Sequence, residues 1–458
     1  MKKNFIAVCT FGFILILSQC RKPEPFEAEA YDERMSGGSQ TAFDATSGAF
    51  SHPFTGMDEY DDDLHGLGDA GFEQTFITAP STYNGGLGPA FNNVSCASCH
   101  HNDGIGVPTT GEGQSALLMR ISFPGADEHN GAVAVPGYGT QIQDKSVFGK
   151  LPEARVNIDT TIQQYSFPDG MNYSLVTPSY SLSNMHEPIN GSYMLSPRLA
   201  PPVFGLGLLE AIPESQILAL ADVNDADHDG ISGKPNYVWN PFTERKELGR
   251  FGLKLNTSTL QVQVAAAYNN DIGITSYVFK NETSHGQANQ SDGIEDDPEL
   301  GDSILNAVVF YVKSLQVPAR RNVTDVQVIR GKQIFKDAKC ASCHNPDFTT
   351  AVNVAFPAAS NQRIHPYTDM LLHDMGEGLA DHRPDFDADG FEWRTTPLWG
   401  VGLFEAVNYP PFYLHDGRAR SLIEAIMWHG GEAQQSKDYV QQLSKEDRDA
   451  LIKFLKSL

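Results

Sequence analysis

Apolar residues at helical spacing mark the last third of the chain. One predicted helix carries the stripe Val328, Gly331 and Phe335, and Gly331 allows another backbone to cross closely. The last predicted helix begins at a capping box, Ser444 to Asp447. Its apolar stripe consists of Leu451, Phe454, Leu455 and Leu458. We expect these two helices to pack together in a mainly α lobe.

A third helix is predicted in the segment RSLIEAIMWHGGEA. Ser421 and Glu424 form a capping box at its start, and the glycine pair 430–431 ends it. Its buried stripe consists of Leu422, Ala425, Ile426 and His429. Met427 points elsewhere. His429 is therefore either a core histidine that bonds to the backbone or a ligand in a buried site.

The first residues form one continuous apolar run. This run, Phe5 to Leu17, follows two lysines and is short for a membrane span, so residues 1–19 are predicted to be a signal peptide. The sequence LSQC then resembles a bacterial lipobox, which predicts lipidation of Cys20. Gln19 departs from the usual small residue, and simple cleavage is the alternative. Residues 20–57 lack periodicity and are predicted to be a flexible tether beginning at the lipidated Cys20.

Charge limits the classes of partner. The chain has 458 residues, with 33 basic and 57 acidic side chains and a formal charge of −24. This balance argues against nucleic acid as a partner and favours basic proteins or cations.

The pentapeptide CASCH occurs at Cys96 to His100 and again at Cys340 to His344, and these motifs contain every cysteine after Cys20. Cys-x-x-Cys alone is compatible with a redox dithiol, half of a zinc site or covalent haem attachment. The adjacent His favours haem, because two thioether bonds place that imidazole where it can bind the iron. We predict haem c attached at Cys96, Cys99, Cys340 and Cys343, with His100 and His344 as iron ligands.

Other segments repeat in the same order as the CASCH motifs. The paired segments are APPVFGLGLLEAI and TTPLWGVGLFEAV, at 200–212 and 395–407, and AVVFYVKSL and ALIKFLKSL, at 307–315 and 450–458. We predict a mainly α fold with two cytochrome c-like haem lobes in tandem, residues 58–317 and 318–458. Longer intervals between the repeats indicate that loop insertions enlarge the first lobe. The boundary is placed at Pro318, which cannot continue the preceding helix.

Longer motifs resemble the bacterial di-haem oxidoreductase family, whose members are described as peroxidases or thiol oxidoreductase-like proteins. The motifs are both CASCH segments, SPRLAPPVFGLGLLEAIP, DGISG, LGRFGLK, DIGITS, PYTDMLLHDMGEGLAD, EWRTTPLWGVGL and LHDGRARSLIEAIMWHGGEA. The lobes are more distantly similar to di-haem cytochrome c peroxidases, in which one haem stores an electron and the other meets peroxide. The resemblance implies an oxidoreductase of this kind.

The distant peroxidases place an axial Met where this chain has His429. The resemblance therefore implies His429 as the sixth ligand of the second haem, and bis-His ligation lowers the haem potential. The first lobe has no counterpart of HDGRA at 415–419, so its distal residue is not transferred. Glu210 is the candidate acid/base group, since O–O cleavage needs a proton on the leaving oxygen. Its repeat at Glu405 favours a structural role as the alternative.

The segment DVNDADHDGISG has the D-x-D-x-D-G order of a calcium loop. Asp225, Asp227 and Asp229 supply oxygens at alternate positions, and Gly230 permits the sharp turn. Asn236 stands at the twelfth position instead of Glu, which weakens the site. The alternative is a solvated acidic turn.

These patterns predict an exported peroxidase that carries a lipid anchor on the bacterial outer membrane, facing the periplasm. The resemblance implies that peroxide is reduced at the first haem and that the second haem relays electrons, which we expect to come from a small redox protein or a quinol-linked donor. One alternative is an electron-transfer cytochrome without catalysis. Another is a surface component that handles haem or metal.

Overall fold

The computed structural model describes residues 31–458 except 112–114 and 283–296, with side chains described from residue 33. The predicted signal peptide and Cys20 lie outside the described residues. Within the described part, no helix is both long enough and apolar enough to cross a membrane.

Ten α-helices are described, together with many short strands. The helices are α1 (Glu59–Glu73), α2 (Leu206–Glu210), α3 (Glu214–Leu218), α4 (Leu260–Ala267), α5 (Asp302–Lys313), α6 (Val326–Asp337), α7 (Phe404–Val407), α8 (Leu422–Trp428), α9 (Gln434–Gln442) and α10 (Lys445–Leu455). The strands are β1 (Thr41–Ala42), β2 (Ala90–Phe91), β3 (Leu117–Ser122), β4 (Gln141–Ile142), β5 (Lys145–Ser146), β6 (Arg155–Ser166), β7 (Asn172–Ser183), β8 (Met194–Leu199), β9 (Tyr237–Asn240), β10 (Arg245–Leu248), β11 (Val317–Pro318), β12 (Phe348–Thr349), β13 (Arg363–Ile364), β14 (Leu372–Asp374) and β15 (Glu392–Arg394).

The prediction of a mainly α fold is wrong. Helices make up 27% of the chain and strands 19%. The strands form one three-stranded sheet, in the order β4-β3-β8, and separate two-stranded ribbons. The ribbons connect the helices through long irregular loops, so the fold is mixed.

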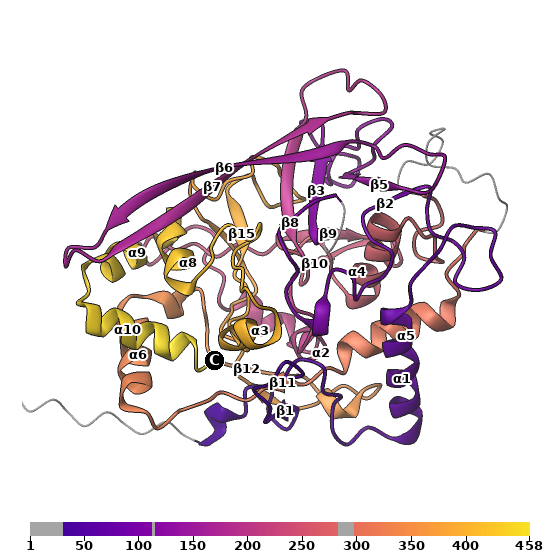
Figure 1. The fold of residues 1–458 in the computed structure, drawn as a ribbon. Coiled ribbons are helices and arrows are strands. Elements are labelled where there is room, and N and C mark those ends of the chain that lie inside the picture. Colours follow the sequence, from indigo (N-terminus) through magenta and orange to yellow (C-terminus); the bar gives the residue numbers. More distant parts are fainter. Residues whose placement is uncertain (1–30, 112–114, 283–296) are drawn as a thin grey trace, which may run out of the picture.

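The longest ribbon is the antiparallel hairpin β6–β7, which pairs Arg155 with Ser183 at one end and Ser166 with Asn172 at the other. It runs over α8 and α9 along the top of Figure 1. Most of β6 is exposed. Val156 of β6 and Leu175 of β7 are the buried residues of the hairpin, so it lacks the long apolar face by which a sequence predicts a strand.

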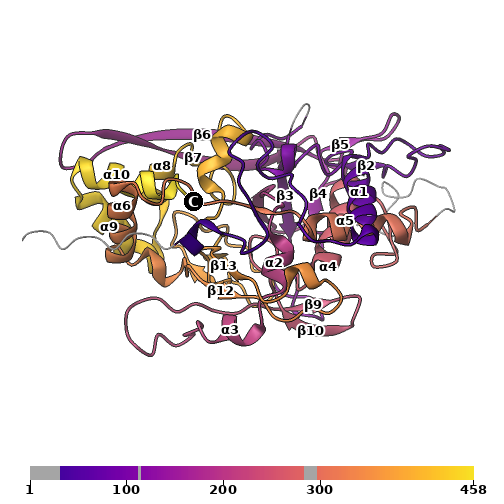
Figure 2. The same cartoon turned by 90° about the horizontal axis from the view of Figure 1, so that it is seen from below.

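Two helix pairs stand at opposite ends of the molecule, α1 with α5 and α6 with α10 (Figures 1 and 2). The predicted register of α6 and α10 is confirmed, because the apolar stripes of both helices are buried. Ser444 caps α10 by accepting a hydrogen bond from the Asp447 amide at 3.2 Å. The first pair repeats this arrangement, as the paired closing segments indicated.

A glycine permits the close crossing in each pair. A Cβ on Gly331 would lie 2.0 Å from the carbonyl oxygen of Ala450, and a Cβ on Gly68 would lie 2.1 Å from that of Ala307. Ala307 and Ala450 are the first residues of the repeated closing segments. The same residues thus meet the same kind of neighbour in both lobes, which supports the predicted internal repeat.

Residues 33–57 correct part of the predicted tether. Phe50 is 0% exposed and Phe54 is 3% exposed. Phe50 stacks on Phe204 with ring centroids 4.3 Å apart, and β1 pairs in parallel with β11. The two aromatic residues give this Gly- and Ser-rich segment a place in the core, so its described part is not a flexible tether.

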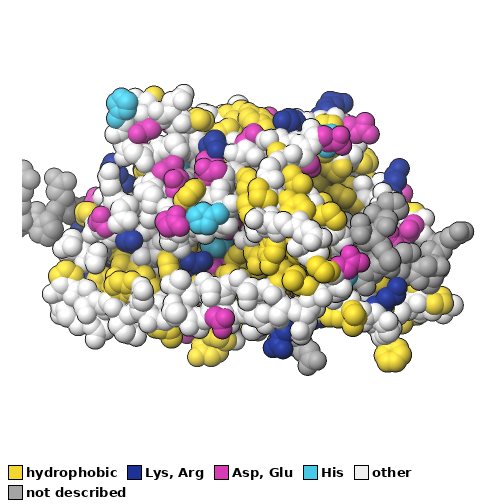
Figure 3. Space-filling model, turned by 90° about the horizontal axis from the view of Figure 1, so that it is seen from above, with side chains coloured by type: hydrophobic (Ala, Val, Ile, Leu, Met, Phe, Trp, Pro, Cys, Tyr) yellow, Lys and Arg dark blue, Asp and Glu magenta, His cyan; other side chains and the backbone are white. Residues whose placement is uncertain are grey.

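The two lobes share one core. A Cβ on Gly205 would meet Trp399, and a Cβ on Gly400 would meet Phe204. These contacts are reciprocal between the repeated segments, and one hydrophobic cluster includes residues of both lobes. On the face seen in Figure 3, hydrophobic side chains gather near the middle and charged side chains of both signs lie around them.

Candidate functional site

The second CASCH motif follows α6 directly. Its cysteines and His344 border one cavity, with Phe335 of α6 beside them. The Nδ1 atom of His344 lies 3.0 Å from the carbonyl oxygen of Tyr367. This contact fixes Nδ1 as the protonated nitrogen and leaves Nε2 free to bind a metal. Burial lowers the pKa of His344 to about 4, so the ring is neutral, as a ligand must be.

Helix α8 lines the same cavity with the residues that the sequence placed on its buried stripe. They are Leu422, Ala425, Ile426 and His429. Met427 is 2% exposed and is not among the lining residues. Nδ1 of His429 lies 2.8 Å from the Ala425 carbonyl oxygen, which again leaves Nε2 free. The structure therefore brings His429 to the site, while its bond to iron stays a prediction.

This cavity fits the predicted haem. It combines the two motif cysteines and two neutral imidazoles, and the rest of its wall is largely apolar. The wall includes residues of the first lobe, namely Ile105, Leu199, Pro201, Pro202, Ile231 and Leu253. Two imidazoles with free Nε2 atoms are the donors that a six-coordinate haem would need, and the apolar wall would suit its macrocycle.

The first CASCH motif lies next to this cavity. Nδ1 of His100 lies 2.7 Å from the carbonyl oxygen of Pro201, a residue that also lines the second cavity. Burial lowers the pKa of His100 to about 4, so this ring is also neutral. Asn93 donates a hydrogen bond of 2.8 Å to the sulfur of Cys99. The two predicted haem sites are therefore neighbours.

Helix α4 is the first-lobe counterpart of α8, although sequence reasoning did not identify it. Thr259 caps α4 and Ser421 caps α8, in each case by accepting from the amide three residues on. Helix α4 packs on α5 as α8 packs on α10. With the two caps aligned, Ala267 takes the place of His429. A methyl group cannot bind iron, so α4 provides no sixth ligand at this position.

Asp271 follows α4 and lies beside the first motif. Its Oδ1 accepts a hydrogen bond of 2.8 Å from Gln141. Burial raises the pKa of Asp271 to about 6, against the opposing charge of Arg120. Its negative charge in turn helps to raise the pKa of Cys96 and Cys99. Such a carboxyl group can take up and release a proton near neutral pH.

Glu210 has structural partners. Its Oε1 accepts a hydrogen bond of 2.8 Å from the Leu260 amide at the start of α4, and its Oε2 lies 2.7 Å from the Lys313 ammonium. Neither of these contacts of the Glu210 side chain involves His100. The catalytic role of Glu210 therefore stays a prediction without support from geometry, and the structural alternative gains two contacts.

Two arginines of the second lobe, Arg418 and Arg420, both have carboxylate partners. Arg418 pairs with Asp416 at 2.8 Å, and Arg420 pairs with Glu424 at 2.7 Å. Trp393 lines the second cavity and also stacks on His415 with centroids 3.8 Å apart.

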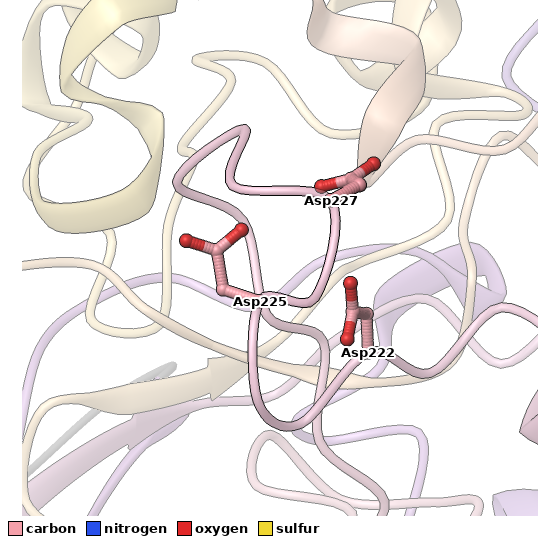
Figure 4. Close-up of side chains that lie close together, drawn as sticks. All are labelled: Asp222, Asp225 and Asp227. Carbon is pink, nitrogen blue, oxygen red and sulfur yellow. The ribbon is translucent and has the colours of Figure 1, made fainter.

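The acidic loop gathers a different trio from the predicted one. Oxygens of Asp222, Asp225 and Asp227 lie within 4.8 Å of one another (Figure 4). Asp229 is not in this group, and its Oδ1 accepts from the Ile231 amide at 2.9 Å. Asp222 precedes the D-x-D-x-D-G pattern, which is why the motif did not include it. Calcium binding by this loop stays a prediction.

The same loop is connected to the second CASCH motif. Ser232 donates its hydroxyl to Glu432 at 2.5 Å, and Glu432 lies 2.6 Å from Nδ1 of His373. His373 lies 3.5 Å from the sulfur of Cys343. Burial disfavours a charge on His373, but the carboxylates of Asp369 and Glu432 outweigh it and raise its pKa. A change in the loop can therefore reach the haem site through hydrogen bonds.

Comparisons with known proteins show which family the chain belongs to. No curated protein matches the chain. A solved structure of hydrazine synthase from Kuenenia stuttgartiensis, pressurised with xenon, is similar over 100% of both chains, with 14% identity and a TM-score of 0.36. A likeness this low carries no argument. The family model "Di-haem oxidoreductase, putative peroxidase" matches residues 31–458. The chain therefore belongs to the di-haem oxidoreductase family, as its motifs indicated.

Proposed function

We propose that this protein is a c-type di-haem peroxidase that reduces hydrogen peroxide at the first haem and receives electrons through the second. Family membership supports haem binding and oxidoreductase activity. The observation that carries the finer proposal is the difference between α8 and α4: His429 faces the second cavity, whereas Ala267 holds the matching position in the first lobe. One site can saturate its iron and the other can keep a position open for peroxide.

Covalent attachment is supported by the state of the cysteines. Burial raises the pKa of Cys96, Cys99 and Cys340 to about 12, which keeps these thiols protonated at neutral pH. A redox dithiol needs a lowered pKa, so this alternative loses support. The four cysteines also do not form one metal-binding group among the described residues. Two separate haem attachments account for both observations.

Peroxide reduction consumes two electrons and two protons and yields two water molecules. Haem iron supplies the redox chemistry when it is bound. We assign the proton transfer to Asp271 instead of Glu210, because Asp271 lies beside the first motif and its pKa is raised to about 6. Its carboxylate would accept a proton from the peroxide and return one to the leaving oxygen. Gln141 would hold that carboxylate in place through its hydrogen bond.

Electron relay is supported by the shared wall between the sites. Pro201 contacts His100 through its carbonyl group and lines the cavity of His344 and His429. His344 and His429 would hold the second haem, and with both imidazoles bound it would supply electron transfer without an open position for an oxidant.

We further propose calcium at Asp222, Asp225 and Asp227, with an effect on the second haem through Ser232, Glu432 and His373. Three hard carboxylate oxygens within reach of one cation are typical ligands of calcium.

The proposed location is the bacterial cell envelope, with a lipid on Cys20 that holds the protein at the outer membrane. The charge of −24 favours a basic redox protein as the electron donor, and a quinol-linked donor is the alternative. Sequence patterns alone support this part of the proposal.

The test is an absorption and EPR study of the resting protein combined with a peroxide-reduction assay. One high-spin and one low-spin haem, with turnover of peroxide, would support the proposal. Two low-spin haems without turnover would favour an electron-transfer cytochrome instead.

A further inference from the structure

We infer that Arg394 anchors a haem propionate in the second cavity. The inference rests on haem occupying that cavity, as proposed above, and adds a residue that positions it. Arg394 ends β15 and is one of the residues lining the cavity.

The guanidinium group of Arg394 has no carboxylate partner among the described residues. Its Nε atom is buried and makes no hydrogen bond. Its side chain makes one weak hydrogen bond among the described residues, of 3.4 Å from Nη1 to the Arg250 carbonyl oxygen. The backbone amide is already satisfied by the Leu253 carbonyl oxygen at 3.0 Å, so β15 holds the residue in place independently of its side chain.

Neighbouring cations differ from Arg394 in this respect. Lys254 lies 2.7 Å from Asp381, and Arg198 lies 3.5 Å from the same carboxylate. Both cations stack over Trp393 of the cavity wall. Arg418, nearby in the same lobe, is paired with Asp416. Within the described residues, carboxylates pair with these three cations and none pairs with Arg394.

An unpaired charge in a largely apolar wall is costly, because burial removes its hydration. Burial lowers the pKa of Arg394 to about 10, so the group still carries its charge at neutral pH. A carboxylate satisfies a guanidinium better than other groups do, since it accepts two parallel hydrogen bonds. Haem brings two propionate carboxylates into the cavity. Arg394 therefore lacks a carboxylate partner in the cavity for which a ligand with two carboxylates is predicted.

The test compares Arg394→Gln, Arg394→Lys and Arg330→Gln in the full-length haem protein. Arg330 belongs to α6 of the same lobe and pairs with Asp447 at the surface, so its loss is a matched change in charge. Redox titration followed by absorption measures both haems, and the propionate bending band in resonance Raman spectra reports the carboxylate contact.

In Arg394→Gln, one redox step should shift to lower potential, because a positive charge near the iron is lost, and the propionate band should move. Arg394→Lys should keep most of the potential but still move the band, since it lacks the fork of the guanidinium. Arg330→Gln should match the wild type in both measurements. If Arg394→Gln prevents folding, the propionate band in the resonance Raman spectrum of Arg394→Lys tests the inference alone.

A free carboxylate or another small anion could pair with Arg394 in the same way. Titration with acetate distinguishes the two sources: with a propionate partner, the wild-type potential does not depend on acetate, whereas with a free anion it does. An acetate dependence that Arg394→Gln abolishes would overturn the inference, as would an unchanged propionate band in both variants. Neither result concerns the open position of the first haem, which spin state and peroxide turnover test separately.

Discussion

The carbonyl oxygen of Pro201 lies 2.7 Å from Nδ1 of His100, and Pro201 also lines the cavity of the second CASCH motif. One residue thus orients the predicted ligand of the first haem and borders the predicted site of the second. The segment before α2 therefore contacts both predicted haem sites.

The first prediction concerns haem content. Replacing Cys96 and Cys99 by Ala should leave one covalent haem, and replacing Cys340 and Cys343 should do the same, because each motif attaches its own group. A pyridine haemochrome assay against protein concentration gives the ratio, with two haems per chain expected in the wild type. Haem that acid-acetone extracts from the wild type would contradict covalent attachment.

The second prediction concerns the axial ligand of the second haem. His429→Ala should convert one low-spin haem to high spin, and His429→Met should raise the potential of that haem. EPR and redox titration measure both effects. Met427→Ala is the matched control, since Met427 lies on the same helix but does not line the cavity. The helix register would be refuted if the Met427 variant became high spin and the His429 variant did not.

The sequence predicted α6, α8 and α10 well, because each has an apolar stripe at helical spacing that packs in the core. The glycine crossings and the place of His429 on the cavity wall follow from the same patterns. The candidate site was predictable to this extent because CASCH and its adjacent His are read from local sequence alone.

Other features depend on contacts that local patterns do not encode. The hairpin β6–β7 buries only Val156 and Leu175, and residues 33–57 owe their order to Phe50 and Phe54 packing on distant segments. The correspondence of α4 and α8 is carried by capping residues and position, while most of the side chains differ. The unpaired charge of Arg394 could be recognised only when its burial and its neighbours were known.

The third prediction tests the close crossing of α1 and α5. Gly68→Ala should destabilise the protein by about 1–3 kcal/mol, because the new Cβ would overlap the Ala307 carbonyl oxygen. Gly66→Ala, on the same helix, meets no atom within 4 Å and should stabilise it by roughly 0.5–1 kcal/mol through helix propensity. Thermal unfolding of both variants measures the difference, and equal effects would argue against the repeated glycine contact.

The fourth prediction concerns calcium. Asp222→Asn should weaken calcium binding, measured by calorimetry on chelator-treated protein, and should reduce the change that calcium causes in the second haem spectrum. Asp229→Asn should have a smaller effect, because Asp229 is outside the trio of neighbouring carboxylates. Ser232→Ala should keep calcium binding but uncouple it from the haem, since Ser232 donates to Glu432. If all three variants behave like the wild type, the loop is a solvated acidic turn.

The fifth prediction separates Asp271 from Glu210. In the wild type, kcat/KM for peroxide should rise with pH and level off above about 6, because the general base must be unprotonated when peroxide arrives. Asp271→Asn should remove this inflection and lower kcat/KM by roughly 10²–10⁴-fold. Glu210→Gln should keep both the rate and the inflection, and lose at most about 1 kcal/mol of stability with its partly exposed ion pair to Lys313.

Stability provides an independent readout for Asp271. Burial raises its folded-state pKa to about 6, above the ordinary value of 3.8, so the folded protein holds this proton more tightly than the unfolded chain. The resulting stabilisation is complete below pH 3.8 and is lost as the pH rises through about 6. Asp271→Asn, which stays uncharged, should therefore exceed the wild type in stability at pH 7 by up to about 3 kcal/mol, and the difference should vanish below pH 4. An inactive variant that is also more stable at neutral pH would show that the buried carboxylate is retained for catalysis, whereas a variant that loses stability and activity together would assign Asp271 a structural role.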